Sequence, residues 1–149
     1  TAGEAPILSL DARAAGNKLT AQLAAELKLD ESGAEEMKRS YGLKSGGSRA
    51  YGEVLGRYGQ RLAERIKEAL NTAGHLPWNA PAISEILLCG GGAALPGLVQ
   101  FLMNTLRLKT RIGNPLVNLA LAPAKVSETT SARFATALGL ALYKTDDTH

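Results

Sequence analysis

The chain has 149 residues, 45% of them hydrophobic and 21% charged, which is the composition of a protein that folds around an apolar core. Its net charge is only +3, and basic and acidic side chains alternate along it, as they do over residues 64–68. A nucleic-acid-binding protein is expected to gather Lys and Arg on one face or tail. The charge pattern therefore disfavours nucleic acid as a partner.

Cys89 is the single cysteine, which excludes a disulfide within the chain and fits a reducing compartment. We expect it to be a small buried side chain rather than a nucleophile, because neither histidine has the sequence context of a catalytic base. A zinc site would need further ligands of the usual spacing. No apolar stretch reaches the ~18–20 residues of a membrane span, and the first residues do not resemble a signal peptide.

The first half of the chain predicts one strand and three helices. An apolar run over 6–13 indicates a short strand, and Asn17 is the expected N-cap of a helix over 18–27. Asp30 should open a second helix that Gly42 ends. After a polar loop over 44–48, apolar residues spaced by three and four predict a long helix over 51–73.

The second half predicts strands alternating with helices, after a linker in which Trp78 should cover a core edge. Residues 83–89 read as a buried strand, 90–92 as a glycine turn and 109–112 as a short strand. Pro96 should start a helix that runs to Leu106. After a loop to about residue 127, a last helix over 130–143 should lie close to a neighbour through its small residues, Ala135, Ala137, Gly139 and Ala141.

This order of elements predicts an α/β fold. Three strands make a thin sheet, so we expect strands from further sequence or from a second copy of the chain. If a second copy of the chain supplies the strands, we expect a homodimer that forms through the incomplete sheet.

The triple glycine over 90–92 is the first candidate binding feature. Without Cβ atoms the backbone can approach a ligand closely, and a helix start would offer free N–H groups. The pattern is neither GxGxxG nor a phosphate loop ending in Gly-Lys-Ser/Thr. Alone, it is equally well explained as a tight turn.

Glu35 and Lys38 are the second candidate, because a spacing of three on a helix places both side chains on one face. Together they could hold hydroxyl groups or the edge of a ring. An exposed surface ion pair is the alternative explanation, and for the pair alone it is the better one.

In combination, these motifs resemble those of the ATPase superfamily of actin, Hsp70 and FtsA. The run Leu87–Leu98 is similar to its adenosine motif, Gly16–Thr20 to its Gly-x-x-hydrophobic-Thr motif, and Ala34–Arg39 to its Glu-x-x-Lys helix. Residues 135–142 resemble its closing helix. The segments at 34–42, 113–116 and 134–142 are most similar to the PilM family of type IV pilus assembly.

The resemblance implies a partial actin-like (ribonuclease H-like) second domain with a small helical subdomain inserted. The expected boundaries are 1–16 for the start of the actin-like subdomain, 17–82 for the inserted helical subdomain and 83–149 for the remainder. The phosphate-binding loops and first domain of such proteins are not in this sequence, so we expect a fragment of less than half of the protein.

The resemblance also implies a nucleotide site, with ATP or ADP and Mg²⁺ bound by the full-length protein. No Arg follows the triple glycine to stack on adenine, as one does in some chaperones; Ala94 takes that place. We expect no nucleotide bound to this fragment, no ATPase activity in it, and weak or undetectable affinity for ATP. The residues implied to bind the cofactor are Gly16, Glu35, Lys38, Gly90, Gly91, Gly92 and Ala94.

The function implied is that of a cytoplasmic scaffold at the inner face of the cytoplasmic membrane, with PilN-like inner-membrane assembly proteins as partners. Two alternatives remain open. The chain could be a fragment of a sugar- or acetate-kinase-type enzyme of the same superfamily, or a protein-interaction domain that binds no small molecule.

Overall fold

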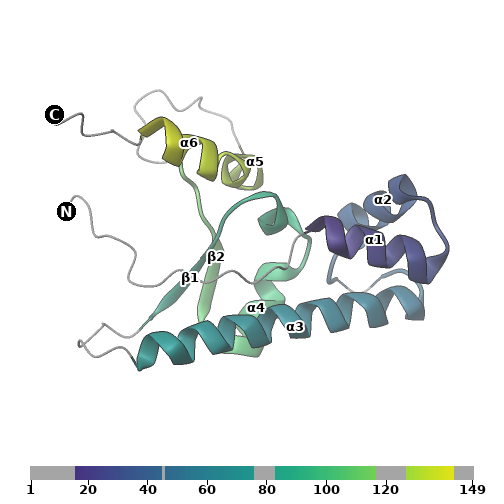
Figure 1. Cartoon of the computed structure of the whole chain (residues 1–149), viewed down its shortest axis with the longest axis horizontal. Coiled ribbons are helices and arrows are strands. Elements are labelled where there is room, and N and C mark those ends of the chain that lie inside the picture. The colour runs from purple at the N-terminus through teal and green to yellow at the C-terminus, as the bar shows by residue number, and fades with distance from the viewer. Residues whose placement is uncertain (1–15, 45, 76–82, 117–126, 143–149) are drawn as a thin grey trace, which may run out of the picture.

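The computed structural model describes residues 16–44, 46–75, 83–116 and 127–142. Helices dominate these residues, with one small sheet beside the long helix α3 (Figure 1). In chain order the elements are α1 (Gly16–Leu27), α2 (Glu31–Tyr41), α3 (Arg49–Gly74), β1 (Glu85–Leu88), the 3₁₀ turn η1 (Gly91–Ala94), α4 (Leu98–Leu106), β2 (Lys109–Ile112), α5 (Glu128–Arg133) and α6 (Ala135–Leu142).

Helices α1, α2 and α3 form a unit in which α1 packs on both of the others. The caps explain the boundaries: the Asp30 side chain accepts from the amide of Gly33, and that of Ser48 accepts from the amide of Tyr51. The expected start of α2 is confirmed. Asn17 is not a cap, because it lies in the first turn of α1. The shared core consists of Leu19, Leu23, Ala34, Tyr51, Val54 and Leu55.

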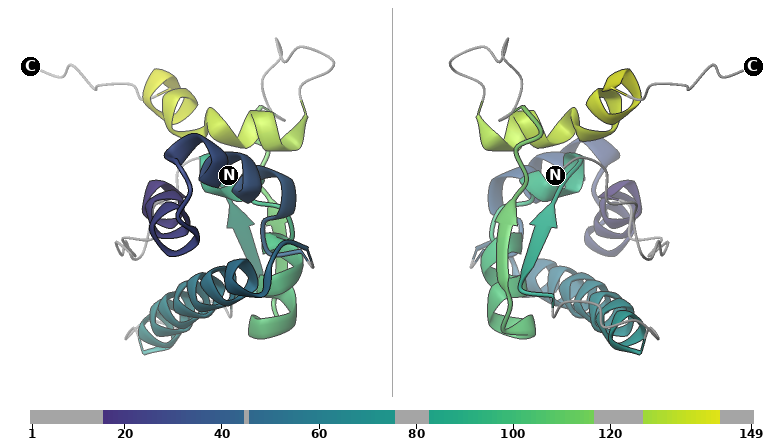
Figure 2. Two further views of the ribbon diagram at one scale, coloured as in Figure 1. Left: turned by 90° about the vertical axis from the view of Figure 1, so that its right-hand side faces the viewer. Right: turned by 90° about the vertical axis from the view of Figure 1, so that its left-hand side faces the viewer.

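The sheet pairs β1 with β2 in parallel, in a register that sets Glu85 beside Lys109 and Leu88 beside Ile112. Helix α4 connects the two strands and packs on α3 and β2. This is a β-α-β unit, and it confirms the coarse α/β prediction. Figure 2 shows both strands running toward α5, so the glycine turn follows the carboxyl end of β1.

Three predictions for the second half were wrong. Strand β1 is only partly buried: Leu87 is 52% exposed, because among the described residues nothing covers that face of the sheet, and Cys89 is exposed as well. The glycine turn leads into η1 rather than directly into a helix. Pro96 does not start α4, because Gly97 adopts a left-handed conformation and the helix begins at Leu98.

The expected last helix is divided into α5 and α6 at Phe134. The Phe134 amide donates to the carbonyl of Ser131, three residues earlier. This 3₁₀-type hydrogen bond tightens the last turn of α5 and ends the helix. Gly139 does not make the expected close contact, since a Cβ atom there would meet no described atom within 4 Å. The expected strand over 6–13, Trp78 and most of the loop before α5 lie outside the described residues.

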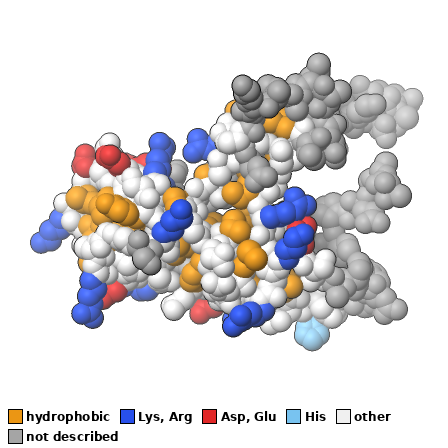
Figure 3. All heavy atoms as spheres, turned by 180° about the vertical axis from the view of Figure 1, so that it is seen from behind, with side chains coloured by type: hydrophobic (Ala, Val, Ile, Leu, Met, Phe, Trp, Pro, Cys, Tyr) orange, Lys and Arg blue, Asp and Glu red, His pale blue; other side chains and the backbone are white. Residues whose placement is uncertain are grey.

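Surface charge is dispersed on the face shown in Figure 3, where basic and acidic side chains lie around the edge of the described region and some basic ones lie among the apolar side chains between. No helix among the described residues has the length and apolar character that crossing a bilayer requires.

A backbone contact joins the helical unit to the glycine turn. The amide of Leu43 donates to the carbonyl of Pro96 at 2.7 Å. Gly42 permits this approach: its φ is +53°, and a Cβ atom there would collide with the same carbonyl oxygen. The loop after α2 is thus held directly against the segment between η1 and α4.

We expect Gly42→Ala to lower the free energy of unfolding by about 2 kcal/mol or more, because it adds both left-handed strain and a collision. Urea denaturation followed by circular dichroism measures the effect. Gly52→Ala is the control: a Cβ atom at this helical position meets nothing within 4 Å. It should raise the stability by up to about 1 kcal/mol. Equal effects of the two substitutions would contradict the proposed close contact.

Candidate functional site

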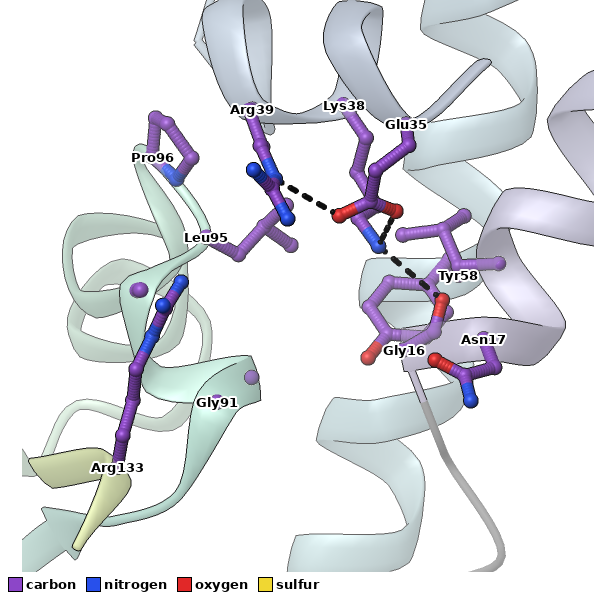
Figure 4. A pocket seen from close by; sticks show the side chains of 13 residues that line it. Gly16, Asn17, Glu35, Lys38, Arg39, Tyr58, Gly91, Leu95, Pro96 and Arg133 are labelled. Carbon is purple, nitrogen blue, oxygen red and sulfur yellow. Dashed lines mark hydrogen bonds and ion pairs between the residues drawn. The ribbon is translucent and has the colours of Figure 1, made fainter. Parts of the chain in front are cut away.

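A cavity of about 310 Å³ opens where α1 and α2 face the glycine turn (Figure 4). This is the lower end of the volume range of small-molecule sites. The cavity brings together segments more than fifty residues apart in the sequence. Its lining consists of Gly16, Asn17, Leu19, Glu35, Lys38, Arg39, Tyr58, Gly91, Gly92, Ala94, Leu95, Pro96 and Arg133.

One wall is a compact polar cluster centred on Thr20, which is 3% exposed. Its hydroxyl donates to a Glu35 carboxylate oxygen at 2.7 Å and accepts from the Lys38 ammonium at 2.8 Å. Glu35 and Lys38 also form an ion pair with each other. Lys38 reaches the carbonyl of Gly16 at 3.4 Å, which ties α2 to the start of α1.

The Glu35–Lys38 pair is therefore not the exposed surface pair that a spacing of three would form alone. The Lys38 side chain is only 13% exposed and that of Glu35 is 32% exposed. The other Glu35 oxygen accepts from Arg39 Nε at 3.0 Å. The hydrogen bond from Lys38, reinforced by those from Thr20 and Arg39, lowers the pKa of Glu35 from 4.5 to about 2. The carboxylate is thus charged and oriented throughout the physiological range.

The opposite wall is the glycine turn. Gly90 has φ +84° and ψ 178°, a combination that essentially only glycine adopts. This lets the chain leave β1 and turn into η1. Gly91 and Gly92 line the cavity, and Cβ atoms at either position would meet nothing within 4 Å. Packing among the described residues does not require glycine there, so the bare backbone leaves open space at the pocket.

Of the residues predicted for the site, Gly16, Glu35, Lys38, Gly91, Gly92 and Ala94 line the cavity together. Gly90 does not line it; its amide donates instead to the carbonyl of Ala132 at 2.8 Å. Whether any of them binds a ligand stays a prediction.

Several lining residues were not predicted. Arg39 could have been found from the sequence, because it lies one turn from Glu35 on the same helix face. Tyr58 belongs to the apolar residues, spaced by three and four, that predict the long helix, and this pattern indicates packing rather than a binding site. Arg133 carries no sequence signal for this site, because it reaches the pocket from α5, about forty residues beyond the glycine turn.

The lining suits binding through hydrogen bonds and charge. It contains one carboxylate and three cationic side chains, so it carries two net positive charges. Among the described residues, no group of three His, Cys, Asp or Glu side chains is placed to hold a metal ion.

These features define a helix-rich α/β protein with a positively charged pocket between a helical unit and a strand–glycine turn. A family model described as type IV pilus assembly protein PilM matches residues 3–145. The chain belongs to this family, and the match assigns it a part in type IV pilus assembly. No curated protein sequence matches the chain significantly.

Because the pKa of Glu35 is low in the folded chain, we predict that the free energy of unfolding depends on pH in the acidic range. A carboxylate whose pKa is lowered by folding stabilises the folded chain above pH 4.5, and this contribution is lost as the pH falls toward 2. We expect the wild type to exceed Glu35→Gln in unfolding free energy by about 1 kcal/mol at pH 6, after screening at a partly exposed site. The difference should shrink toward zero near pH 2.

Urea denaturation at a series of pH values measures this. Glu53→Gln is the control, because Glu53 also pairs with an arginine four residues away but is well exposed. It should keep the acid dependence of the wild type, since Glu35 is intact. A constant difference between wild type and Glu35→Gln from pH 6 to pH 2 would contradict the assignment.

Proposed function

We propose that the pocket binds an adenine nucleotide, ATP or ADP, and that this chain supplies its adenosine-side contacts. One observation carries the proposal: Gly16, the Glu35–Lys38 pair and the glycine turn, which the sequence resemblance implies as cofactor-binding elements, line a single cavity. Their joint position could not follow from local sequence, so it supports the resemblance independently.

The chemistry of the cluster fits a ribose or a base edge. Glu35 is held as a carboxylate, an acceptor for hydroxyl or amino hydrogens, and Lys38 beside it is a donor. The bare backbone of Gly91 and Gly92 leaves room for a flat group to approach. The proposal assigns no Mg²⁺ ligand to the described residues.

In the proposed role, nucleotide acts by favouring one arrangement of the elements around the pocket rather than through turnover. Such a protein would work as a scaffold for pilus assembly at the inner face of the cytoplasmic membrane. Its partners would be inner-membrane assembly proteins similar to PilN.

The binding proposal is tested by titrating the ¹⁵N-labelled chain with ADP and following amide chemical shifts, a method that detects millimolar affinities. We expect the largest shifts at Gly91, Gly92 and Lys38. Replacing Glu35 and Lys38 together by Gln should weaken ADP binding about tenfold or more, since each loses a charge-assisted hydrogen bond.

The matched control replaces Glu64 and Lys67 by Gln, which removes the same charges at the same spacing from an exposed part of α3. This variant should bind ADP as the wild type does. If ADP shifts no amide around the pocket, the nucleotide proposal fails and a domain that acts only through protein contacts is favoured.

A further inference from the structure

Arg133 differs from the other cationic side chains of the pocket in its pairing. Lys38 and Arg39 both lie against the Glu35 carboxylate. Within the described parts of the chain, no carboxylate lies within ion-pair distance of Arg133. On α2, the Glu35 carboxylate forms ion pairs with both Lys38 and Arg39. The charge of Arg133 remains available to a ligand.

Arg133 is also on the other side of the cavity. Figure 4 shows its side chain extending from α5 along the glycine turn, beside Gly91 and across the cavity from Glu35 and Lys38. A ligand that contacts the polar cluster of α2 with one end therefore has Arg133 at its other end.

Two hydrogen bonds hold the residues just before Arg133. Ser131 is fully buried, and its hydroxyl donates to the side-chain oxygen of Asn114 at 2.5 Å. The carbonyl of Ala132 accepts from the amide of Gly90. The same Asn114 oxygen also accepts from the amide of Leu116, which fixes its orientation. The short helix α5 is thus anchored to both the loop after β2 and the start of the glycine turn.

We propose that Arg133 binds the phosphate groups of the nucleotide, and that Asn114 and Ser131 are positioning residues that hold it beside the glycine turn. This inference rests on the proposed nucleotide site and extends it beyond the adenosine end. A guanidinium without an acidic partner matches phosphate oxygens in charge, and its planar donors match them in geometry. The neutral end of the ligand then lies against Glu35 and Lys38, which are already paired with each other.

The test compares ADP with adenosine, which lacks the phosphates, by chemical-shift titration of the chain. The wild type should bind ADP more tightly. Arg133→Gln should weaken ADP binding about tenfold and change adenosine binding by less than about twofold. Arg107→Gln removes the same charge from an exposed residue outside the pocket and should leave both affinities unchanged.

The positioning role is tested with Ser131→Ala alone and combined with Arg133→Gln. If Ser131 acts through Arg133, its replacement weakens ADP binding in the wild type but has no further effect in the Arg133→Gln background. An unchanged adenosine affinity shows that the pocket is still folded. If Ser131→Ala unfolds the chain, Asn114→Ser, which loses the same bond from the other side, takes its place in the cycle.

Each outcome decides between the two proposals. If the wild type binds neither ligand, the nucleotide site fails and the role of Arg133 fails with it. If adenosine and ADP bind but Arg133→Gln lowers neither affinity, or lowers both equally, the nucleotide site stands and the phosphate contact is overturned.

Discussion

The hydrogen bond from the Leu43 amide to the Pro96 carbonyl is the constraint on which the pocket depends. It joins the loop that ends α2 to the segment that follows the glycine turn, so it sets the distance between the two walls. Gly42 makes this possible by combining a positive φ with the absence of a side chain that would meet Pro96. Gly97 contributes from the other side, since a Cβ atom there would lie 3.0 Å from the amide nitrogen of Lys44. Both contacts hold the loop after α2 close to the segment that contributes Leu95 and Pro96 to the cavity lining.

The distribution of charge in the pocket depends on the Glu35 carboxylate, which several polar side chains share. Glu35 accepts from Thr20 and Arg39 and pairs with Lys38, and both Glu35 and Lys38 contact the buried Thr20 hydroxyl. This arrangement is preorganised, because its polar groups are already oriented before any ligand arrives. Arg133 stands apart from it on α5. The two cations on the α2 side are paired with Glu35, whereas Arg133 has no carboxylate partner among the described residues. The anionic end of a ligand would therefore lie at Arg133.

Elements defined by local physical chemistry were predictable from the sequence. The start of α2 at Asp30 and its end at Gly42 depend on a side-chain cap and a left-handed glycine, and both are visible in the residues themselves. The long helix α3 was predicted from the spacing of its apolar residues, and β2 from a short segment between turn residues.

Predictions that required knowledge of spatial neighbours were less accurate. Cys89 and Leu87 were expected to be buried because they follow or form an apolar run, but burial depends on what covers a strand. The last helix was expected to be continuous, but the bond that ends α5 at Phe134 has no distinct sequence signal.

The sequence by itself determined the family, the α/β alternation and six of the thirteen residues that line the candidate pocket, because motifs and caps act over a few residues along the chain. Tertiary structure alone decided three things: the burial of Thr20 between Glu35 and Lys38, the contact between Gly42 and Pro96, and the placement of Arg133 beside Gly91. In each of these the partners are separated by fifteen residues or more in the sequence. Contacts over such distances are set by how helices and loops pack, and a residue type at one position carries no information about which distant backbone it will meet.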